Sequence, residues 1–333
     1  MNTWFKYIKL LLLSVCTFLL VTGCNSNISE LLSNQSTSNI TTNCRVINHE
    51  AGKTQICGQP KKVVALSPPV LDMMLALGVQ PAGYAEVDLL NSKVFDRPKE
   101  QIPYLGDRIT SQPINVGDRG NPSLESLLQL KPDLILGEAA YNESEYQILN
   151  KIAPTILINH RDGITPAWQQ TISIIAQALG REDKVPAVIA EYEQKLSQAK
   201  TAIAPIAQHQ ELLLLAFRGI TLTSFTFGAE TFAGKLLQDL GFKLISPEST
   251  EYEVALEVLP KFKSDLIVVM PSGNNNIENA KRQWSQNPIL QSISATNTNR
   301  IYFIDYQLAS RIRGPIAAEF FVNQVRQLLT SYP

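Results

Sequence analysis

Histidine and recognisable catalytic motifs are scarce in this chain. It has 3 histidines among 333 residues, and none is paired with a second histidine at metal-ligand spacing. The sequence contains no Gly-x-Ser-x-Gly, P-loop, Gly-x-Gly-x-x-Gly or His-Glu-x-x-His motif. We therefore predict a protein that is not an enzyme, with no metal site and no cofactor.

An excess of charge of one sign is also missing. Lys and Arg total 29, Asp and Glu total 30, and the formal net charge is −1. A nucleic-acid-binding protein should carry a strong basic excess, so no nucleic-acid partner is predicted. The apolar content of 44% and the charged content of 18% are typical of a folded globular protein, and the length allows two domains.

The chain has only 4 cysteines, and one of them follows an export signal. Lys6 and Lys9 precede an apolar run, residues 10–21, that is too short for a comfortable transmembrane helix. The run ends in Val-Thr-Gly before Cys24, which resembles a bacterial lipobox, so residues 1–23 are predicted to be a lipoprotein signal peptide and Cys24 the lipidated residue. The alternative is an ordinary signal peptide. The Ser-, Thr- and Asn-rich residues 24–43 are predicted to form a flexible tether.

Two further cysteines remain in the exported part of the chain. Cys44 and Cys57 enclose an Ala-Gly pair, which predicts a hairpin over residues 44–60 with the cysteines near its ends. An even pair in an oxidising compartment favours a structural disulfide. A nucleophile or a metal ligand is the alternative for each thiol.

A repeated pattern predicts two similar lobes. Glu125, in a Leu-Glu pair, is followed eight residues later by Asp133 and an apolar strand, and Glu257 and Asp265 repeat this arrangement. Strand-like runs alternate with helical segments, which favours parallel sheets covered on both faces. The predicted strands are 63–66, 134–137, 155–158, 212–217, 266–270 and 301–304. The predicted fold class is α/β, with two parallel-sheet lobes.

One long amphipathic helix is predicted to join the lobes. It runs from about residue 183 to 204, with Asp183 as its cap, Pro186 in its first turn and Pro205 at its end. Shorter helices are predicted over 168–179 and 315–329, and the polar stretch 91–122 is predicted as loops. The resulting divisions are the hairpin 44–60, an N-terminal lobe 61–165, a helical connector 166–205 and a C-terminal lobe 206–333.

Five arginines on predicted loops indicate a site for an anionic ligand. They are Arg218 after strand 212–217, Arg311 and Arg313 before the last helix, and Arg108 and Arg119 in the polar stretch. Ligands of α/β lobes meet the loops at the carboxyl ends of strands, and guanidinium groups suit oxyanions. Tyr84 and Trp168 are candidate aromatic walls. The alternative for each arginine is an ion pair, and Asp107 and Asp118 lie beside Arg108 and Arg119.

Taken together, these residues resemble a known family. The lipobox, the tether, the connecting helix, Ser-Leu-Glu…Lys-Pro-Asp-Leu-Ile at 123–135, the stretch 310–319 and the cysteine hairpin look like the substrate-binding proteins of ABC importers for ferric siderophores and vitamin B12, in the ferric-citrate and hydroxamate branch. The resemblance covers about residues 44–330. The second copy departs from the pattern, with Lys-Ser-Asp at 263–265.

The resemblance implies a receptor of the type III periplasmic-binding-protein-like fold. Its ligand is a ferric siderophore held between the lobes, and Glu125 and Glu257 dock on an ABC permease dimer with its ATPase. It is expected to be a lipid-anchored monomer at the periplasmic face of the inner membrane or the outer face of the cell membrane. The alternatives are a corrinoid or haem receptor, an exported hydrolase and a surface adhesion lipoprotein. The chelate, whether citrate, hydroxamate or mixed, is left open.

Overall fold

The computed structural model describes residues 43–88, 93–159, 168–208 and 210–331. The predicted signal peptide, Cys24 and all of the predicted tether except Asn43 lie outside these residues. Among the helices within these ranges, none combines the length and the apolar character needed to cross a membrane.

The N-terminal lobe is built on a parallel sheet with the strand order β11-β10-β3-β4-β7. Its strands are β3 (Val63–Ala65), β4 (Gly83–Tyr84), β7 (Ile114–Asn115), β10 (Leu134–Glu138) and β11 (Thr155–Ile158). The three predicted strands are present. The prediction of loops over 91–122 was wrong, because this stretch contains β7 and five other short strands and helices, which are given below. Elements of two to four residues are too short to show a hydrophobic period.

Short helices and strand pairs surround this sheet. They are α2 (Pro68–Ala76), β5 (Val87–Asp88), β6 (Lys93–Val94), α3 (Pro98–Gln101), η1 (Gly106–Arg108), β8 (Gly117–Asp118), β9 (Asn121–Pro122), α4 (Leu124–Leu130), α5 (Ala139–Asn142) and α6 (Tyr146–Ile152). Helix α4 begins after Ser123, whose side chain accepts a hydrogen bond of 3.2 Å from the Ser126 N–H. It ends at Lys131, whose φ of 51° closes the helix in the left-handed region.

The C-terminal lobe has a mixed sheet with the order β15-β13-β12-β16-β17, and β14 also pairs with β12. Its strands are β12 (Glu211–Phe217), β13 (Ser224–Phe227), β14 (Lys243–Leu244), β15 (Glu251–Val254), β16 (Leu266–Pro271) and β17 (Ile301–Phe303). The expectation of a wholly parallel sheet was wrong here, since β13 runs antiparallel to β12 and β15. The connection 218–223 is too short for a parallel crossover, which needs a dozen or more residues.

Both faces of each sheet are covered, as predicted. Leu212 and Leu214 of β12 belong to one buried cluster, whereas Leu213 and Leu215 belong to another, so alternate residues enter opposite layers. The helices of this lobe are α9 (Phe232–Asp239), η3 (Leu256–Lys261), α10 (Ile277–Gln286), α11 (Pro288–Gln291), α12 (Ser294–Asn297), η4 (Gln307–Arg311) and α13 (Pro315–Thr330).

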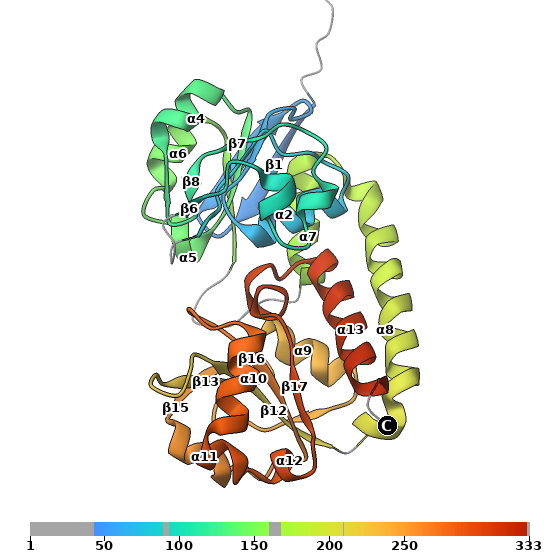
Figure 1. Ribbon diagram of the computed structural model, residues 1–333. Helices are drawn as coiled ribbons and strands as arrows, with labels where there is room; N and C mark the ends of the chain where they lie inside the picture. Colours follow the sequence, from blue (N-terminus) through green and yellow to red (C-terminus); the bar gives the residue numbers. More distant parts are fainter. Residues whose placement is uncertain (1–42, 89–92, 160–167, 209, 332–333) are drawn as a thin grey trace, which may run out of the picture. The chain divides into compact units, whose positions relative to one another are not determined.

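The connector consists of α7 (Trp168–Leu179), η2 (Glu182–Lys184) and α8 (Val185–Ala207). Helix α8 has 23 residues, which corresponds to a rod of about 35 Å. It begins at Val185, with Asp183 inside η2 instead of capping the helix, and it continues through Pro205, so the predicted start and end were wrong. A proline so close to the end removes a single N–H, and Gln208 still donates to the Ala204 carbonyl at 3.2 Å. Helix α8 packs along α13 (Figure 1).

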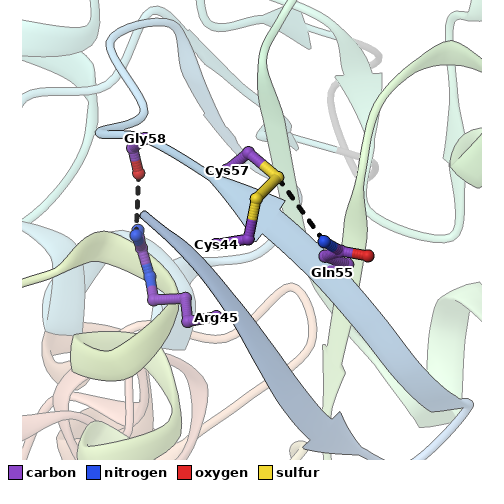
Figure 2. Close-up of a disulfide and its surroundings, with 5 residues drawn as sticks. All are labelled: Cys44, Arg45, Gln55, Cys57 and Gly58. Carbon is purple, nitrogen blue, oxygen red and sulfur yellow. Dashed lines mark hydrogen bonds between the residues drawn. A yellow bond between two sulfur atoms is a disulfide. The ribbon is translucent and has the colours of Figure 1, made fainter. Parts of the chain in front are cut away.

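The cysteine hairpin is formed by β1 (Cys44–His49) and β2 (Gly52–Cys57), and the predicted disulfide joins Cys44 to Cys57 (Figure 2). The guanidinium of Arg45 donates to the carbonyls of Gly58, Gln177 and Ala178 at 2.7, 2.6 and 2.8 Å. These bonds tie the hairpin to the end of α7. Ile47 and Ile56 enter the main core from the same hairpin.

Candidate functional site

The carboxyl ends of strands from both lobes carry paired charges. Arg313, just before α13, donates from Nη2 to Oε1 of Glu138 at 2.7 Å. Glu138 is the last residue of β10, and only 1% of its side chain is exposed. Arg313 has a φ of 56°, a strained conformation for a residue with a side chain. The ion pair thus joins the two lobes at a position where the backbone is held away from its preferred region.

A second ion pair joins Arg311 to a glutamate that follows strand β4. Nη2 of Arg311 donates to Oε1 of Glu86, which follows β4. Burial raises the pKa of Glu86, and the charges of Arg311 and Arg119 oppose that rise. The guanidinium of Arg119 also lies 4.0 Å from the centre of the Tyr141 ring. The structure therefore brings Arg311 and Arg119 close to one buried carboxylate.

A pocket of about 490 Å³ opens at the carboxyl ends of β16 and β17. Its lining includes Gly273, Asp305 and Arg311, with the rest contributed by Pro271, Ser272, Asn275, Asn276, Ile277, Glu278, Tyr306 and Gln307. Arg218 is exposed, and its Nε would lie 3.9 Å from a Cβ built on Gly273. Arg218 therefore stands at the edge of this pocket. The glycine that follows it, Gly219, has a φ of 120°, which permits the turn after β12.

Two further contacts between the lobes flank these ion pairs. Tyr104 donates through its hydroxyl to Oδ2 of Asp305 at 2.8 Å. Asp72 of α2 is fully buried, and its carboxylate accepts from the N–H groups of Ile316 and Ala317, each at 2.9 Å. It thereby caps α13 from the other lobe. A Cβ on Gly314 would lie 2.3 Å from Cγ of Asp72, so this approach requires glycine.

Three of the predicted ligand residues lie elsewhere. Arg108 lines a separate pocket of about 320 Å³ with residues of α8 and α13, among them Lys195 and Glu319. Tyr84 is 1% exposed and donates to the Phe95 carbonyl. Trp168 is 3% exposed and packs edge-on against Tyr192, with the ring centres 5.2 Å apart. Both aromatic side chains belong to the main hydrophobic core, where burial removes their large apolar rings from water, and neither is exposed as a wall for a ligand.

The two glutamates of the repeat are exposed in corresponding elements. Glu125 lies in the first turn of α4, and Glu257 lies in the first turn of η3. The carboxylate of Glu125 accepts a hydrogen bond of 3.3 Å from Gln129. The second element is a 3-10 helix rather than an α-helix, since Pro260 interrupts it.

Sequence reasoning did not find the carboxylates that pair with the arginines. Glu86 follows strand β4, and Glu138 ends strand β10. An acidic residue at the carboxyl end of a predicted strand was the feature of the sequence that could have identified them. A chelate of iron needs no iron ligands from the protein, and within the described ranges no three His, Cys, Asp or Glu side chains gather as a metal site. The arrangement offers guanidinium groups and buried carboxylates to a polar ligand.

The chain is similar to known proteins in sequence and in fold. The sequence profile described as periplasmic binding protein matches residues 63–308. The chain is 29% identical to the Fe(3+)-citrate-binding protein YfmC of Bacillus subtilis, over 96% of each chain. It is 25% identical to the Fe(3+) dicitrate-binding periplasmic protein FecB of Escherichia coli, over 82% of this chain and 86% of that protein. The fold matches Staphylococcus aureus SirA complexed with staphyloferrin B with a TM-score of 0.70 and 25% identity, covering 86% of this chain and 98% of SirA.

Proposed function

Because the chain belongs to the periplasmic binding protein family, we propose that it is an extracytoplasmic receptor that binds a ferric siderophore and delivers it to an ABC importer. The observation that carries this proposal is the set of arginines in the segments that follow strands of both lobes, Arg119, Arg218, Arg311 and Arg313. Guanidinium groups donate two hydrogen bonds in one plane, which suits the paired oxygens that chelate Fe(III) in carboxylate and hydroxamate siderophores. The names of the relatives, which refer to ferric citrate and siderophores, support the same ligand class.

The anchoring and the partners belong to the same proposal. Lipid at Cys24 holds the receptor at the membrane, with residues 25–43 as a tether. The exposed Glu125 and Glu257 pair with arginines on the two subunits of the permease, and the ATPase drives import. The receptor acts as a monomer, because each lobe presents one such glutamate to one permease subunit.

The rival ligands fit the residues less well. A corrinoid or haem needs a broad apolar and aromatic wall, whereas Tyr84 and Trp168 are buried in the core. A hydrolase needs a nucleophile beside a base. The charged groups of the site are instead paired arginines and carboxylates, which suit binding.

A fluorescence titration tests the proposal. Trp284 packs against Phe217 with ring centres 5.8 Å apart, and Phe217 directly precedes Arg218, so tryptophan emission should respond to an occupied site. We expect quenching by at least one chelate in a panel of ferric citrate, ferric trihydroxamate and mixed chelates, and weak quenching by the iron-free forms. Haemin and a corrinoid serve as rival ligands. Saturable binding of either rival, with no binding of ferric chelates, would contradict the proposal.

A further inference from the structure

Two of the four arginines of the site already form ion pairs with carboxylates from the opposite lobe. Arg313 pairs with Glu138, and Arg311 pairs with Glu86. The side chains of these glutamates are 1% and 8% exposed, so water screens neither pair strongly. Each buried pair has a net charge close to zero. Two of the four arginines therefore add little net positive charge to the site.

The remaining charges do not restore an excess of positive charge. Arg119 lies near Glu86, but Asp118 lies near the same carboxylate. Asp305 and Glu278 line the pocket that also contains Arg311. Glu251 is near enough to Arg313 to feel its charge. The site thus combines many donors for hydrogen bonds with a balanced charge.

One acceptor in this group has an unmet requirement. Among the buried side-chain atoms in the described part of the chain, Oε2 of Glu138 has no hydrogen-bond partner. A buried carboxylate oxygen without a donor keeps its negative charge uncompensated. Because this oxygen is buried, it acts on a ligand through that charge and not as an acceptor that the ligand contacts, which disfavours a polyanionic chelate more than a neutral one.

We propose that Glu86 and Glu138 are specificity-determining residues that favour ferric chelates of net charge near zero over polyanionic chelates. Each glutamate cancels the charge of the arginine it pairs with, while the arginine keeps further N–H groups for the chelating oxygens. The assignment rests on the receptor function proposed above. It narrows the ligand class to chelates such as neutral ferric trihydroxamates.

Neutral isosteres of the two glutamates test the assignment. Dissociation constants are measured by tryptophan quenching at one pH and ionic strength for the wild type, Glu86→Gln and Glu138→Gln. The probes are a neutral ferric trihydroxamate and ferric citrate. Glu193→Gln is the control, because Glu193 is exposed on α8. Glutamine keeps one carbonyl acceptor for the arginine, removes the negative charge and replaces the second oxygen by an NH2 group.

The expected result depends on the charge of the probe. The wild type should bind the trihydroxamate more tightly than ferric citrate. Each Gln variant should bind ferric citrate on the order of tenfold more tightly than the wild type does, because the variant lacks one negative charge that repels this anion. Affinity for the neutral chelate should change less than threefold, and the control should match the wild type. Equal changes for both chelates, or a wild type that prefers ferric citrate, would overturn the assignment.

Two outcomes are kept apart by design. A wild type that binds no ferric chelate contradicts the receptor function itself, whereas binding without a charge-dependent change contradicts only the role of the glutamates. If Glu138→Gln fails to fold, Glu86→Gln decides, since the Arg311–Glu86 pair is less buried, with 21% and 8% of its side chains exposed.

Discussion

Asp133 and Asp265 occupy the same structural position in the two lobes. The N–H of Asp133 donates to the Lys62 carbonyl at 3.1 Å, and that of Asp265 donates to the Glu211 carbonyl at 2.8 Å. In return, the Asp133 carboxylate accepts from the Lys62 N–H at 2.9 Å, and the Asp265 carboxylate accepts from the Glu211 N–H at 2.7 Å. Each aspartate thus fixes the start of two neighbouring parallel strands. The repeat read from the sequence is therefore a repeat in structure, and it places Glu125 and Glu257 in equivalent elements.

The equivalence of these glutamates leads to a prediction about transport. The double variant Glu125→Ala, Glu257→Ala should strongly slow iron uptake, because two oriented contacts with the permease are lost. Each exposed pair contributes only about 0–1 kcal/mol, so the single variants should be mild. Uptake is measured with radioactive iron in cells, and chelate affinity is measured on the isolated protein.

A matched control removes the same charge elsewhere. Glu182→Ala, Glu193→Ala takes two exposed glutamates from the connector and should transport normally. Unimpaired uptake in the Glu125, Glu257 variant would show that these residues only complement their helices. Loss of chelate binding in that variant would show that Glu125 or Glu257 belongs to the ligand site and not to a permease-docking surface.

Arg218 and Arg313 should respond differently to replacement. Arg218→Ala should weaken chelate binding by about 1.5–3 kcal/mol, the scale of a hydrogen bond to a charged group, with little change in stability, because Arg218 is exposed. Arg313→Ala leaves the buried Glu138 without its cation and should lower the free energy of unfolding by about 3–5 kcal/mol. Titration and urea unfolding of both variants provide the measurements. Full affinity in Arg218→Ala would remove that arginine from the site.

The stability of the protein should depend on Asp72 below neutral pH. Burial raises the pKa of Asp72 to about 7, against the opposing effect of its two backbone hydrogen bonds. The folded state therefore keeps a proton that the unfolded chain releases near pH 4. As the pH rises from about 4 to about 7, the free energy of unfolding should fall by up to about 1.4 kcal/mol per pH unit. Above that range it should level off.

The variant Asp72→Asn isolates this contribution. Asparagine keeps an acceptor for α13 but cannot titrate, so the fall between pH 4 and pH 7 should be smaller in the variant than in the wild type. Urea unfolding at several pH values gives both curves. Parallel curves would mean that Asp72 does not hold a proton over this range.

The disulfide should stabilise the hairpin without being needed for the fold. The cysteines are 13 residues apart, and closing a loop of this size contributes about 3 kcal/mol at most. Arg45 and the buried Ile47 and Ile56 also hold the hairpin, so reduction should lower the Tm while the lobes stay folded. Mass spectrometry of exported protein, alkylated without reductant, should find both cysteines unmodified. The double variant Cys44→Ser, Cys57→Ser should reproduce the lowered Tm without reductant.

The sequence by itself determined the elements whose residues interact locally. Helix α7 and strand β11 have the predicted ends, and each of the other predicted strands differs by one residue at one end. These predictions succeed because hydrophobic periodicity follows from the geometry of a single element. The repeat was predicted from spacing, and the disulfide was predicted from an even pair of cysteines in an exported chain. The antiparallel edge formed by β13 and β15 was missed, since its pairing depends on how the connection after β12 turns.

Only the tertiary structure decided what each charged side chain contacts. Arg313 and Glu138 are 175 residues apart in the chain, and no local pattern links them. Arg108 and Arg119 looked alike in sequence, each beside an aspartate, yet one lines a pocket with α8 and α13 and the other lies near Glu86. The partners of a side chain are set by which elements the packing of the core brings together, and that packing depends on the whole chain at once.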